Sequence, residues 1–382
     1  MKIVHMSDSH LGFSNFNRVD KYGRNLVEEM IYQGFEQAVE RIIHLKPDVL
    51  IHAGDVFHHV RPRIRPLYVF KRGLEKLQDA GISVVIISGN HDSPKSYSAI
   101  SPFYIFEGMK DVSIAHKYQY ESFHFEGHTF HCIPFCLDPD DYIKEFSKIG
   151  RSGNDVLVMH GLVESLKNKK MRTVGEHELR DSLLKSDFDY IALGHYHGQT
   201  QISKNAWYSG SIEYFNFGEA SDRKGILLAD LEKGVVEQIE IKPKYMIDHP
   251  AIDCSGMSPA ELSETLQNVC DPDRIKDHIL RINLENVSRS AYRNLNHAKL
   301  SKLTSAALYF KIRIEYDEEK ERIDDMPVNA LRLHEEYARF LEDQASRNMV
   351  SKSIKNDAEV YGSNLLKRAV EAHNIEAMDA SE

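Results

Sequence analysis

The sequence has no long apolar run and few cysteines, and each absence narrows the class of protein. No stretch approaches the ~20 apolar residues of a membrane-spanning helix. No leader is expected, because Met1-Lys2-Ile3 enters a strand-like segment directly. The four cysteines, Cys132, Cys136, Cys254 and Cys270, have neither secretory spacing nor a second pair for a zinc site. We therefore expect reduced, buried thiols in a cytoplasmic protein.

Five short segments each end a β-like run with side chains that can bind metal. The runs are Lys2–Met6, Asp48–His52, Ile82–Ser88, Val156–Met159 and Tyr190–Leu193. The segments that follow them are Asp8-Ser9-His10, Gly54-Asp55, Gly89-Asn90-His91-Asp92, His160-Gly161 and Gly194-His195-Tyr196-His197. Strands that stop at such side chains deliver them to one edge of a sheet. A lone His-x-His pair is more often solvated or core, but five segments in this order indicate a metal site.

The donor types narrow the metal and the chemistry. Two aspartates, one asparagine and four histidines, without cysteine, form a mixed nitrogen and oxygen site. Such a site suits Mn or Fe, with Mg or Zn as alternatives, and argues against a thiolate-rich structural zinc. So many ligands exceed the needs of one ion, so two ions that share a bridging carboxylate are expected. Two metals about 3.5–4 Å apart can clamp a phosphodiester and generate hydroxide near neutral pH.

The order Asp-x-His, Gly-Asp, Gly-Asn-His-Asp, His-Gly, Gly-x-His resembles the signature of the binuclear calcineurin-like metallophosphoesterases. Within them, four segments look like the SbcD-type double-strand-break repair nucleases, closest to the archaeal members: Gly54–Pro66, Ser88–Pro94, Gly194–His197 and Tyr208–Glu219. The resemblance covers residues 1–245 well and 246–325 in outline. One departure is Ser209, where many relatives have proline, and we expect it to affect only a loop near the site.

The resemblance implies two Mn ions per subunit, with Mg or another divalent metal as the alternative. It divides the ligands into two sets that share one carboxylate: Asp8, His10, Asp55 and His197 for one ion, and Asp55, Asn90, His160 and His195 for the other. It also implies that His91 is no ligand but the proton donor or transition-state stabiliser. His58 corresponds to a histidine that handles the DNA backbone.

Positive charge is in the minority, since 48 Lys and Arg residues stand against 58 Asp and Glu residues and leave a net charge of −10. That balance suggests modest affinity for DNA, because phosphate contacts supply much of such affinity. The runs Arg61–Arg72 and Lys167–Arg172 are nevertheless basic, and both follow ligand segments. They predict a local positive rim beside the site. Ordinary solvated charge on a helix or loop is the alternative.

Residues 1–245 alternate short apolar strands with helical patterns and hairpins. The spacing predicts helices over Leu26–Leu45 and Pro66–Ala80, and hairpins over Phe123–Phe130 and Gly225–Ile241. This alternation indicates an α/β fold, a two-sheet sandwich flanked by helices, which the resemblance also implies for the nuclease domain.

Lys242-Pro243 and His249-Pro250 predict a boundary, followed by a small α+β domain over residues 246–325. Its expected strands are Ala251–Cys254, His278–Leu284 and Leu308–Tyr316, and its expected helices are Ser258–Val269 and Ser288–Ala307. The resemblance implies a cap that contacts DNA. Four cations are candidates for phosphate contacts, with a solvated helix face as the alternative: Arg289, Arg293, Lys299 and Lys302.

The charged run Asp317–Asp325 predicts a linker to a C-terminal segment, residues 326–382. Amphipathic helices are expected over Val328–Ser346 and Asp357–Ala372, with a disordered tail after His373. These helices either pack back on the nuclease domain or dock on a partner. The resemblance favours docking on the coiled-coil ABC-type, SMC-like ATPase of the same repair complex, and it also implies a homodimer.

The favoured function is an Mn-dependent DNA nuclease of double-strand-break repair, nucleoid-associated, acting as a 3′→5′ exonuclease on duplex ends and an endonuclease on single strands or hairpins. The polarity comes from the resemblance alone. One alternative is another phosphoesterase of this fold. Protein phosphatases of the type carry Gly-Asp-x-x-Asp-Arg-Gly and Arg-Gly-Asn-His-Glu, which Gly54–Val60 and Ser88–Asp92 lack. The second alternative is a structural protein that tethers DNA ends and has a vestigial nuclease site. The complete ligand set disfavours this alternative.

Overall fold

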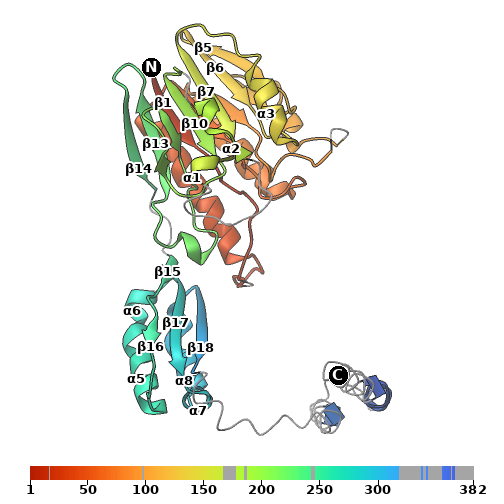
Figure 1. Cartoon of the computed structure of the whole chain (residues 1–382), viewed down its shortest axis with the longest axis vertical. Helices are drawn as coiled ribbons and strands as arrows, with labels where there is room; N and C mark the ends of the chain where they lie inside the picture. Colours follow the sequence, from red (N-terminus) through yellow and green to blue (C-terminus); the bar gives the residue numbers. More distant parts are fainter. Residues whose placement is uncertain are drawn as a thin grey trace, which may run out of the picture. The chain divides into compact units, whose positions relative to one another are not determined.

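The computed structural model describes residues 1–16, 18–96, 99–166, 178–184, 187–241 and 246–317, with short helical pieces at 337–338, 341–342, 355–362 and 364–365. The chain divides into two compact units. The first comprises Met1–Ile252, Ser258–Leu284 and Asn294–Ile314; the second comprises Asp253–Met257 and Glu285–Arg293 and continues from Glu315. Figure 1 labels most of the helices and strands. The basic run Lys167–Arg172 and most of the linker Asp317–Asp325 lie outside the described residues. Among the helices that are described, none combines the length and apolarity that crossing a membrane requires.

The predicted α/β sandwich is confirmed, and it is built from two six-stranded sheets. The first has the order β14-β13-β1-β2-β3-β4: Val235–Glu240, Gly225–Asp230, Lys2–Met6, Val49–Ala53, Ser83–Ile87 and Val112–Ala115. The second has the order β11-β12-β10-β7-β6-β5: Thr200–Gln201, Ala206–Tyr208, Tyr190–Gly194, Asp155–His160, His128–Ile133 and Glu121–Phe125. Strands β1 to β4 pair in parallel, as do β6, β7, β10 and β12. Parallel strands that follow one another bring their carboxyl ends to a common edge.

Alternation along the strands divides the core into layers. Ile3 and Ile51 of the first sheet share a buried cluster with Val158 and Ala192 of the second. Met6, three positions further along β1 than Ile3, instead faces a cluster that includes helix side chains. Successive residues of a strand point to opposite faces. The central strands are therefore buried on both faces, which explains their continuous apolar runs.

Two helices supply that outer cluster. Helix α1 spans Leu26–Leu45, as predicted. Asn25 caps its N-terminus, because the Asn25 side chain accepts hydrogen bonds from the backbone N–H groups of Val27 and Glu28 at 3.0 and 3.1 Å. Helix α2 spans Ile64–Asp79, so the prediction of a start at Pro66 is wrong by two residues. Proline is tolerated throughout a first helical turn and does not mark its first residue.

Both predicted hairpins are confirmed. Strands β5 and β6 join across Glu126 and Gly127, which have φ of 46° and 80°. Two positive φ values in a two-residue loop match the twist of the paired strands. Strands β13 and β14 pair through Asp230 and Val235.

A smaller sheet follows, with the order β15-β17-β16 and β18 beside β17: Met246–Asp248, Ile279–Val287, Ile252–Asp253 and Tyr309–Tyr316. Helix α5, Pro259–Val269, carries the expected capping box of Ser258 and Glu261. The single helix expected over Ser288–Ala307 is wrong. The segment forms α7 (Arg289–Arg293), α8 (His297–Leu303) and the turn η4 (Thr304–Ala306). Asn296 starts a new helix, because its side chain accepts from Lys299 N at 2.9 Å.

Candidate metal centre

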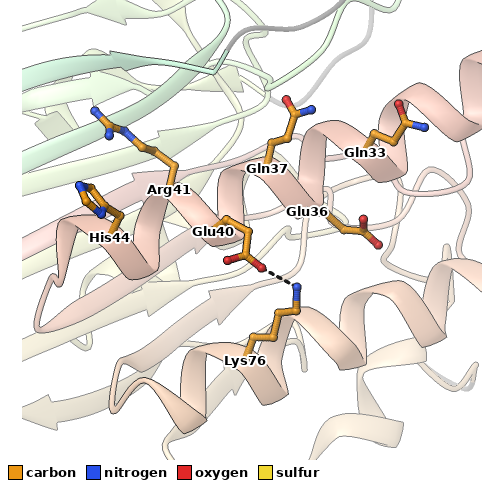
Figure 2. A pocket seen from close by; sticks show the side chains of 7 residues that line it. All are labelled: Gln33, Glu36, Gln37, Glu40, Arg41, His44 and Lys76. Atoms are coloured by element: carbon orange, nitrogen blue, oxygen red, sulfur yellow. Dashed lines mark hydrogen bonds and ion pairs between the residues drawn. The ribbon is translucent and has the colours of Figure 1, made fainter.

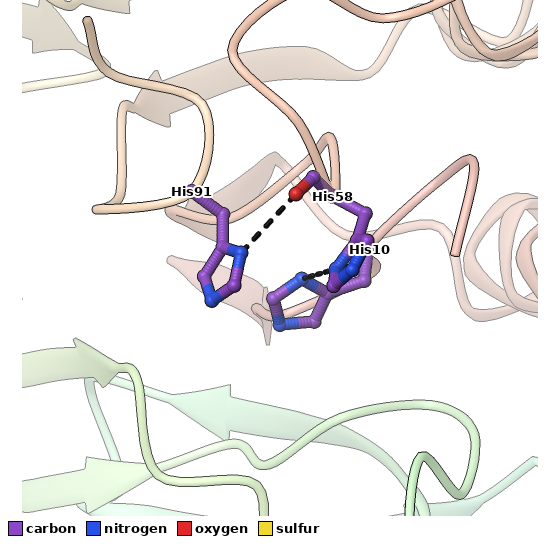
Figure 3. Close-up of side chains that lie close together, drawn as sticks. All are labelled: His10, His58 and His91. Atoms are coloured by element: carbon purple, nitrogen blue, oxygen red, sulfur yellow. Dashed lines mark hydrogen bonds between the residues drawn. The ribbon is translucent and has the colours of Figure 1, made fainter. Parts of the chain in front are cut away.

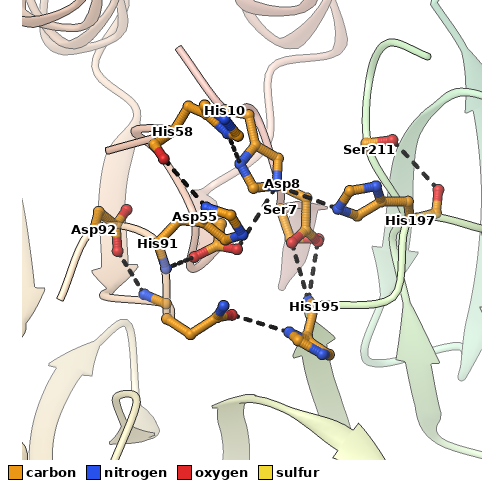
Figure 4. Close-up of polar contacts among 12 residues, drawn as sticks. Ser7, Asp8, His10, Asp55, His58, His91, Asp92, His195, His197 and Ser211 are labelled. Atoms are coloured by element: carbon orange, nitrogen blue, oxygen red, sulfur yellow. Dashed lines mark hydrogen bonds and ion pairs between the residues drawn. The ribbon is translucent and has the colours of Figure 1, made fainter. Parts of the chain in front are cut away.

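The predicted ligand segments converge at one edge of the sandwich (Figure 4). Asp8 and His10 follow β1, Asp55 follows β2 and Asn90 follows β3. On the second sheet, His160 ends β7, while His195 and His197 follow β10. Each loop thus leaves the carboxyl end of a parallel strand, which is the reason that residues far apart in sequence meet here.

The first of two donor groups comprises Asp8, His10 and His197, whose ligand atoms lie within 4.8 Å of one another. The Nε2 atoms of His10 and His197 are 3.2 Å apart. The Asp8 carboxylate accepts from the backbone N–H of His195 at 3.1 Å and from the Ser7 hydroxyl. These bonds fix Asp8 without using all of its lone pairs.

The second group comprises Asp55, His160 and His195, again within 4.8 Å, with Asn90 among them. The amide oxygen of Asn90 lies 3.0 Å from His160 Nε2 and 3.0 Å from His195 Nδ1. His160 Nδ1 lies 2.8 Å from the carbonyl oxygen of Ala53, to which it donates. Because Nδ1 is used in this bond, Nε2 is the nitrogen left for a metal ion, and it presents a lone pair once its proton is lost.

Asp55 lies between the two groups. Its Oδ2 is 3.6 Å from His10 Nε2 and 3.5 Å from His160 Nε2, while its Oδ1 accepts from the backbone N–H of His91 at 2.8 Å. Metal–ligand bonds of about 2.0–2.2 Å hold neighbouring ligand atoms roughly 3 Å apart. Lone pairs that converge at such distances fit two cations that share Asp55.

The pKa values of the buried ligand side chains show that this site stabilises positive charge near Asp55. Burial opposes protonation of His160, but attraction to Asp55 outweighs burial and raises the pKa of His160 to about 9. Burial also opposes ionisation of Asp55, yet His160 and His10 lower the pKa of its carboxyl well below the usual range. For His10, burial dominates and lowers the pKa. Metal ions would take over the role of these protons, so binding is expected to release protons.

The ligand loops use backbone conformations that side chains seldom adopt. Asp8, His10, Asp55 and His195 have φ of 52°, 43°, 54° and 98°. Left-handed residues of this kind cost roughly 1–3 kcal/mol each and persist where the surroundings impose them. A Cβ on Gly89 would overlap the Asp55 carboxylate, so only glycine lets these loops approach so closely.

His91 and His58 lie beside His10 of the first group (Figure 3). Their rings stack with centroids 5.1 Å apart, and His91 Nδ1 lies 3.1 Å from the His58 carbonyl oxygen. His58 Nδ1 is 3.4 Å from His10 Nδ1, and burial together with His91 lowers the pKa of His58 to about 4. His91 is exposed whereas His10 is buried. Ring nitrogens of His10, His58 and His91 also lie within 4.8 Å of one another, so the assignment of His58 and His91 as non-ligands stays a prediction.

Three residues that support the ligands had no predicted role. Asp92 accepts from the backbone N–H groups of Gly89 and Val56 at 2.7 and 2.6 Å, and so joins two ligand loops. Glu219 accepts from His197 Nδ1 at 2.9 Å, and Lys224 donates to Glu219 at 2.8 Å. Asp92 and Glu219 fall within motifs that the resemblance highlights. Lys224 carries no local signal of its burial.

A cavity of about 580 Å³ opens beside the centre, and its lining includes Asp55, His91, His195, Tyr196 and Asn216. A second hollow, of about 550 Å³, lies on the outer faces of α1 and α2 (Figure 2). It contains none of the candidate ligands and carries the ion pair of Lys76 with Glu40 at 2.5 Å. Of these two hollows, the first adjoins the candidate ligands.

Comparisons with known proteins agree with this geometry. Residues 1–210 match the family model of the calcineurin-like phosphoesterases. The chain is 26% identical over 273 residues to the DNA double-strand break repair protein Mre11 of Methanococcus maripaludis, which covers 65% of this chain and 69% of that protein. It is 27% identical over 267 residues to the protein of that name from Methanocaldococcus jannaschii, covering 65% and 69%. With the Sulfurisphaera tokodaii protein of that name, the identity is 25% over 348 residues, covering 86% and 85%.

Proposed function

The chain belongs to the calcineurin-like phosphoesterase family, and from that premise we propose that it is a DNA nuclease of double-strand-break repair. The observation that carries the proposal is the position of Asp55 Oδ2, 3.6 Å from His10 Nε2 and 3.5 Å from His160 Nε2, between two complete donor groups. The substrate is proposed from the similarity to archaeal proteins whose names specify DNA double-strand break repair.

The donor groups would hold two divalent ions, Mn by preference from their mixed nitrogen and oxygen donors. We assign Asp8, His10 and His197 to one position, Asn90, His160 and His195 to the other, and Asp55 to both. When bound, such ions stabilise charge on a phosphodiester and lower the pKa of water. The chain itself positions the ligands, excludes water from their buried faces and supplies the groups that touch the substrate.

His91 is the proposed proton donor, and His58 the residue that orients the phosphate. The backbone N–H of His91 is tied to Asp55 at 2.8 Å, and its ring lies 4.7 Å from that of His10. Because Nδ1 faces the His58 carbonyl oxygen at 3.1 Å, the Nε2 of this exposed ring is the atom placed to exchange a proton with a substrate. We extend the resemblance to 3′→5′ exonuclease action on duplex ends and endonuclease action on single strands or hairpins.

The decisive test is Asp55→Ala, with Asp79→Ala on the exposed end of α2 as the matched control. Calorimetric titration with Mn should show two sites in the wild type and the control, and essentially none in Asp55→Ala, while circular dichroism shows the sandwich intact. Cleavage of linear DNA should disappear with the ions. Two ions retained at wild-type affinity would refute the bridging role. A wild-type protein that hydrolyses a small chromogenic phosphodiester but not DNA would instead favour another phosphodiesterase of this fold.

A partner is proposed for the C-terminal segment. Tyr337 donates to the Ala358 carbonyl oxygen at 3.3 Å, so the described helical pieces contact each other. Val360, Tyr361 and Leu365 are nevertheless exposed by 65%, 70% and 48%. We propose that these side chains dock on a coiled-coil ABC-type ATPase, in a cytoplasmic, nucleoid-associated homodimer.

A chain that ends at Asp325 tests the partner. It should keep Mn-dependent cleavage, because every assigned ligand lies between Asp8 and His197, and it should fail to co-purify with the ATPase. The full chain is the control. Undiminished co-purification of the shortened chain would refute the docking role.

A further inference from the structure

Lys224 is a buried cation behind the metal centre. Its side chain is 0% exposed, and its Nζ donates to Glu219 Oε2 at 2.8 Å, to Ser211 Oγ at 2.8 Å and to the His197 carbonyl oxygen at 3.1 Å. An ammonium group is costly to bury unless it is paired and hydrogen-bonded. All three donors of Lys224 are therefore committed, and two of the bonds lead to His197, directly or through Glu219.

Glu219 connects this cation to the ring of His197. Its Oε1 accepts from His197 Nδ1 at 2.9 Å and from Asn216 Nδ2 at 2.6 Å, while Oε2 accepts from Lys224 and from the backbone N–H of Phe215 at 3.2 Å. A carboxylate on Nδ1 fixes the tautomer in which Nε2 presents its lone pair. That Nε2 is the atom that lies 3.2 Å from His10 Nε2.

The same segment also holds the main chain around the first donor group. Ser211 N donates to the His197 carbonyl oxygen at 3.0 Å, beside Lys224. Ser209 Oγ lies 2.8 Å from Ser7 Oγ, and Ser7 bonds to the Asp8 carboxylate. Residues 209–224 thus support His197 at its ring and its backbone, and Asp8 through one hydroxyl.

The second donor group is anchored differently. His160 donates to the carbonyl oxygen of Ala53 on β2, and Asn90 Oδ1 faces His160 and His195. Tyr142 of α3 (Pro139–Phe146) also donates to the His160 carbonyl oxygen at 2.7 Å. The supports named here for the second group lie outside residues 209–224. The two donor groups are therefore held by different sets of neighbouring residues.

We propose that Lys224 and Glu219 are positioning residues that set the affinity of one metal position, that of Asp8, His10 and His197, without setting the affinity of the other. The proposal rests on the metal centre under the proposed function. Removal of Lys224 should weaken metal binding at the position of Asp8, His10 and His197 and leave the affinity of the second position unchanged.

Lys224→Met tests this, with Lys233→Met as the matched control, because Lys233 lies in the same β13–β14 hairpin with its side chain 73% exposed. Calorimetry and electron paramagnetic resonance with Mn should resolve two affinities. In Lys224→Met, the Mn affinity of the position formed by Asp8, His10 and His197 should fall about 10–100-fold, as is typical when the partner of a ligating histidine is lost. The Mn affinity of the other position should not change. Glu219→Gln keeps the shape and removes the charge, so it should cause the same selective loss to a smaller degree. If Lys224→Met does not fold, the two Mn affinities of Glu219→Gln test the proposal instead.

The ratio of the two affinities separates positioning from general destabilisation. Equal weakening at both positions, or no change at either in a folded variant, would overturn the proposal. A wild-type protein that binds no Mn would overturn the metal centre itself, which is a different result from a variant that retains both ions.

Discussion

The proposed role of His91 is in the chemical step and not in metal binding. The backbone N–H of His91 donates to Asp55 at 2.8 Å, and its exposed ring lies 4.7 Å from the ring of His10. His91→Ala should therefore keep both Mn ions and DNA-end binding, while cleavage falls by roughly 10²–10⁴, the usual effect of removing a general acid–base group. Calorimetry and single-turnover cleavage measure the two effects.

His44→Ala is the control for that variant, because His44 is an exposed histidine on α1 away from the ligand loops. It should change neither quantity. Loss of an ion from His91→Ala would place His91 among the ligands.

The five ligand segments could be predicted because each follows an apolar strand, and strand ends meet at an edge. The choice of ligands within them comes from the resemblance and stays a prediction. The supporting residues could not be predicted. Lys224 becomes a buried cation only because Glu219, Ser211 and the His197 carbonyl oxygen surround it in space. Nothing in the local pattern of a Lys before a strand distinguishes this lysine from Lys233, which solvent surrounds.

Three of the five cations in the basic run Arg61–Arg72 form ion pairs. Arg65 pairs with Glu29, and Lys71 and Arg72 pair with Glu75. Arg61 and Arg63, just before the helix, are exposed, and neither has an ion pair in the described part of the chain. The run carries no acid in sequence, but three of its five cations pair with two neighbouring acids in the fold.

Substitution of Arg61 and Arg63 together by Ala should therefore weaken DNA binding regardless of sequence. The slope of log K against log salt should fall by roughly 1–2, since each phosphate contact contributes about 0.9. Lys71 and Arg72, replaced together, are the matched control and should change the slope less. Fluorescence anisotropy across a salt series gives both slopes. An unchanged slope after substitution of Arg61 and Arg63 would show that DNA phosphates bind to another part of the surface.

Elements with strong local signals could be predicted, and those without them could not. Helix α1 has an Asn cap and a continuous apolar face, and its bounds agree with the prediction. The segment 288–307 is as long, but Asn296 stops the helix by capping the next one. Strands β4 and β15 are short, and only their neighbours in the sheets make them strands.

At the scale of the molecule, alternation of strands and helices predicted a sandwich but not its strand order. Strand β13 pairs with β1 in antiparallel register, Lys2 opposite Asp230, although more than half of the larger domain separates them in sequence. Such pairing depends on burial over the whole sheet. The position of Ser209 and Lys224 behind the ligands follows from it, because their segment leads into β13.

The proposed homodimer makes a prediction for the whole molecule. On α2, Ile64 and Tyr68 are exposed by 85% and 61%, and Ile105 of η1 (Pro102–Phe106) is exposed by 63%. The two elements are neighbours, since Phe70 and Phe106 pack with ring centroids 5.2 Å apart. Exposed apolar side chains gathered on adjoining elements are typical of protein interfaces.

Ile64→Asp combined with Ile105→Asp should therefore yield a monomer in light scattering, because a charge placed in a desolvated contact is costly. Val235→Asp is the control, since Val235 is 57% exposed on the edge strand β14, and it should leave the mass unchanged. Mn titration should still show two ions in every variant, because each ligand comes from one chain. A double variant that retains the dimer mass would show that the subunits meet through another face.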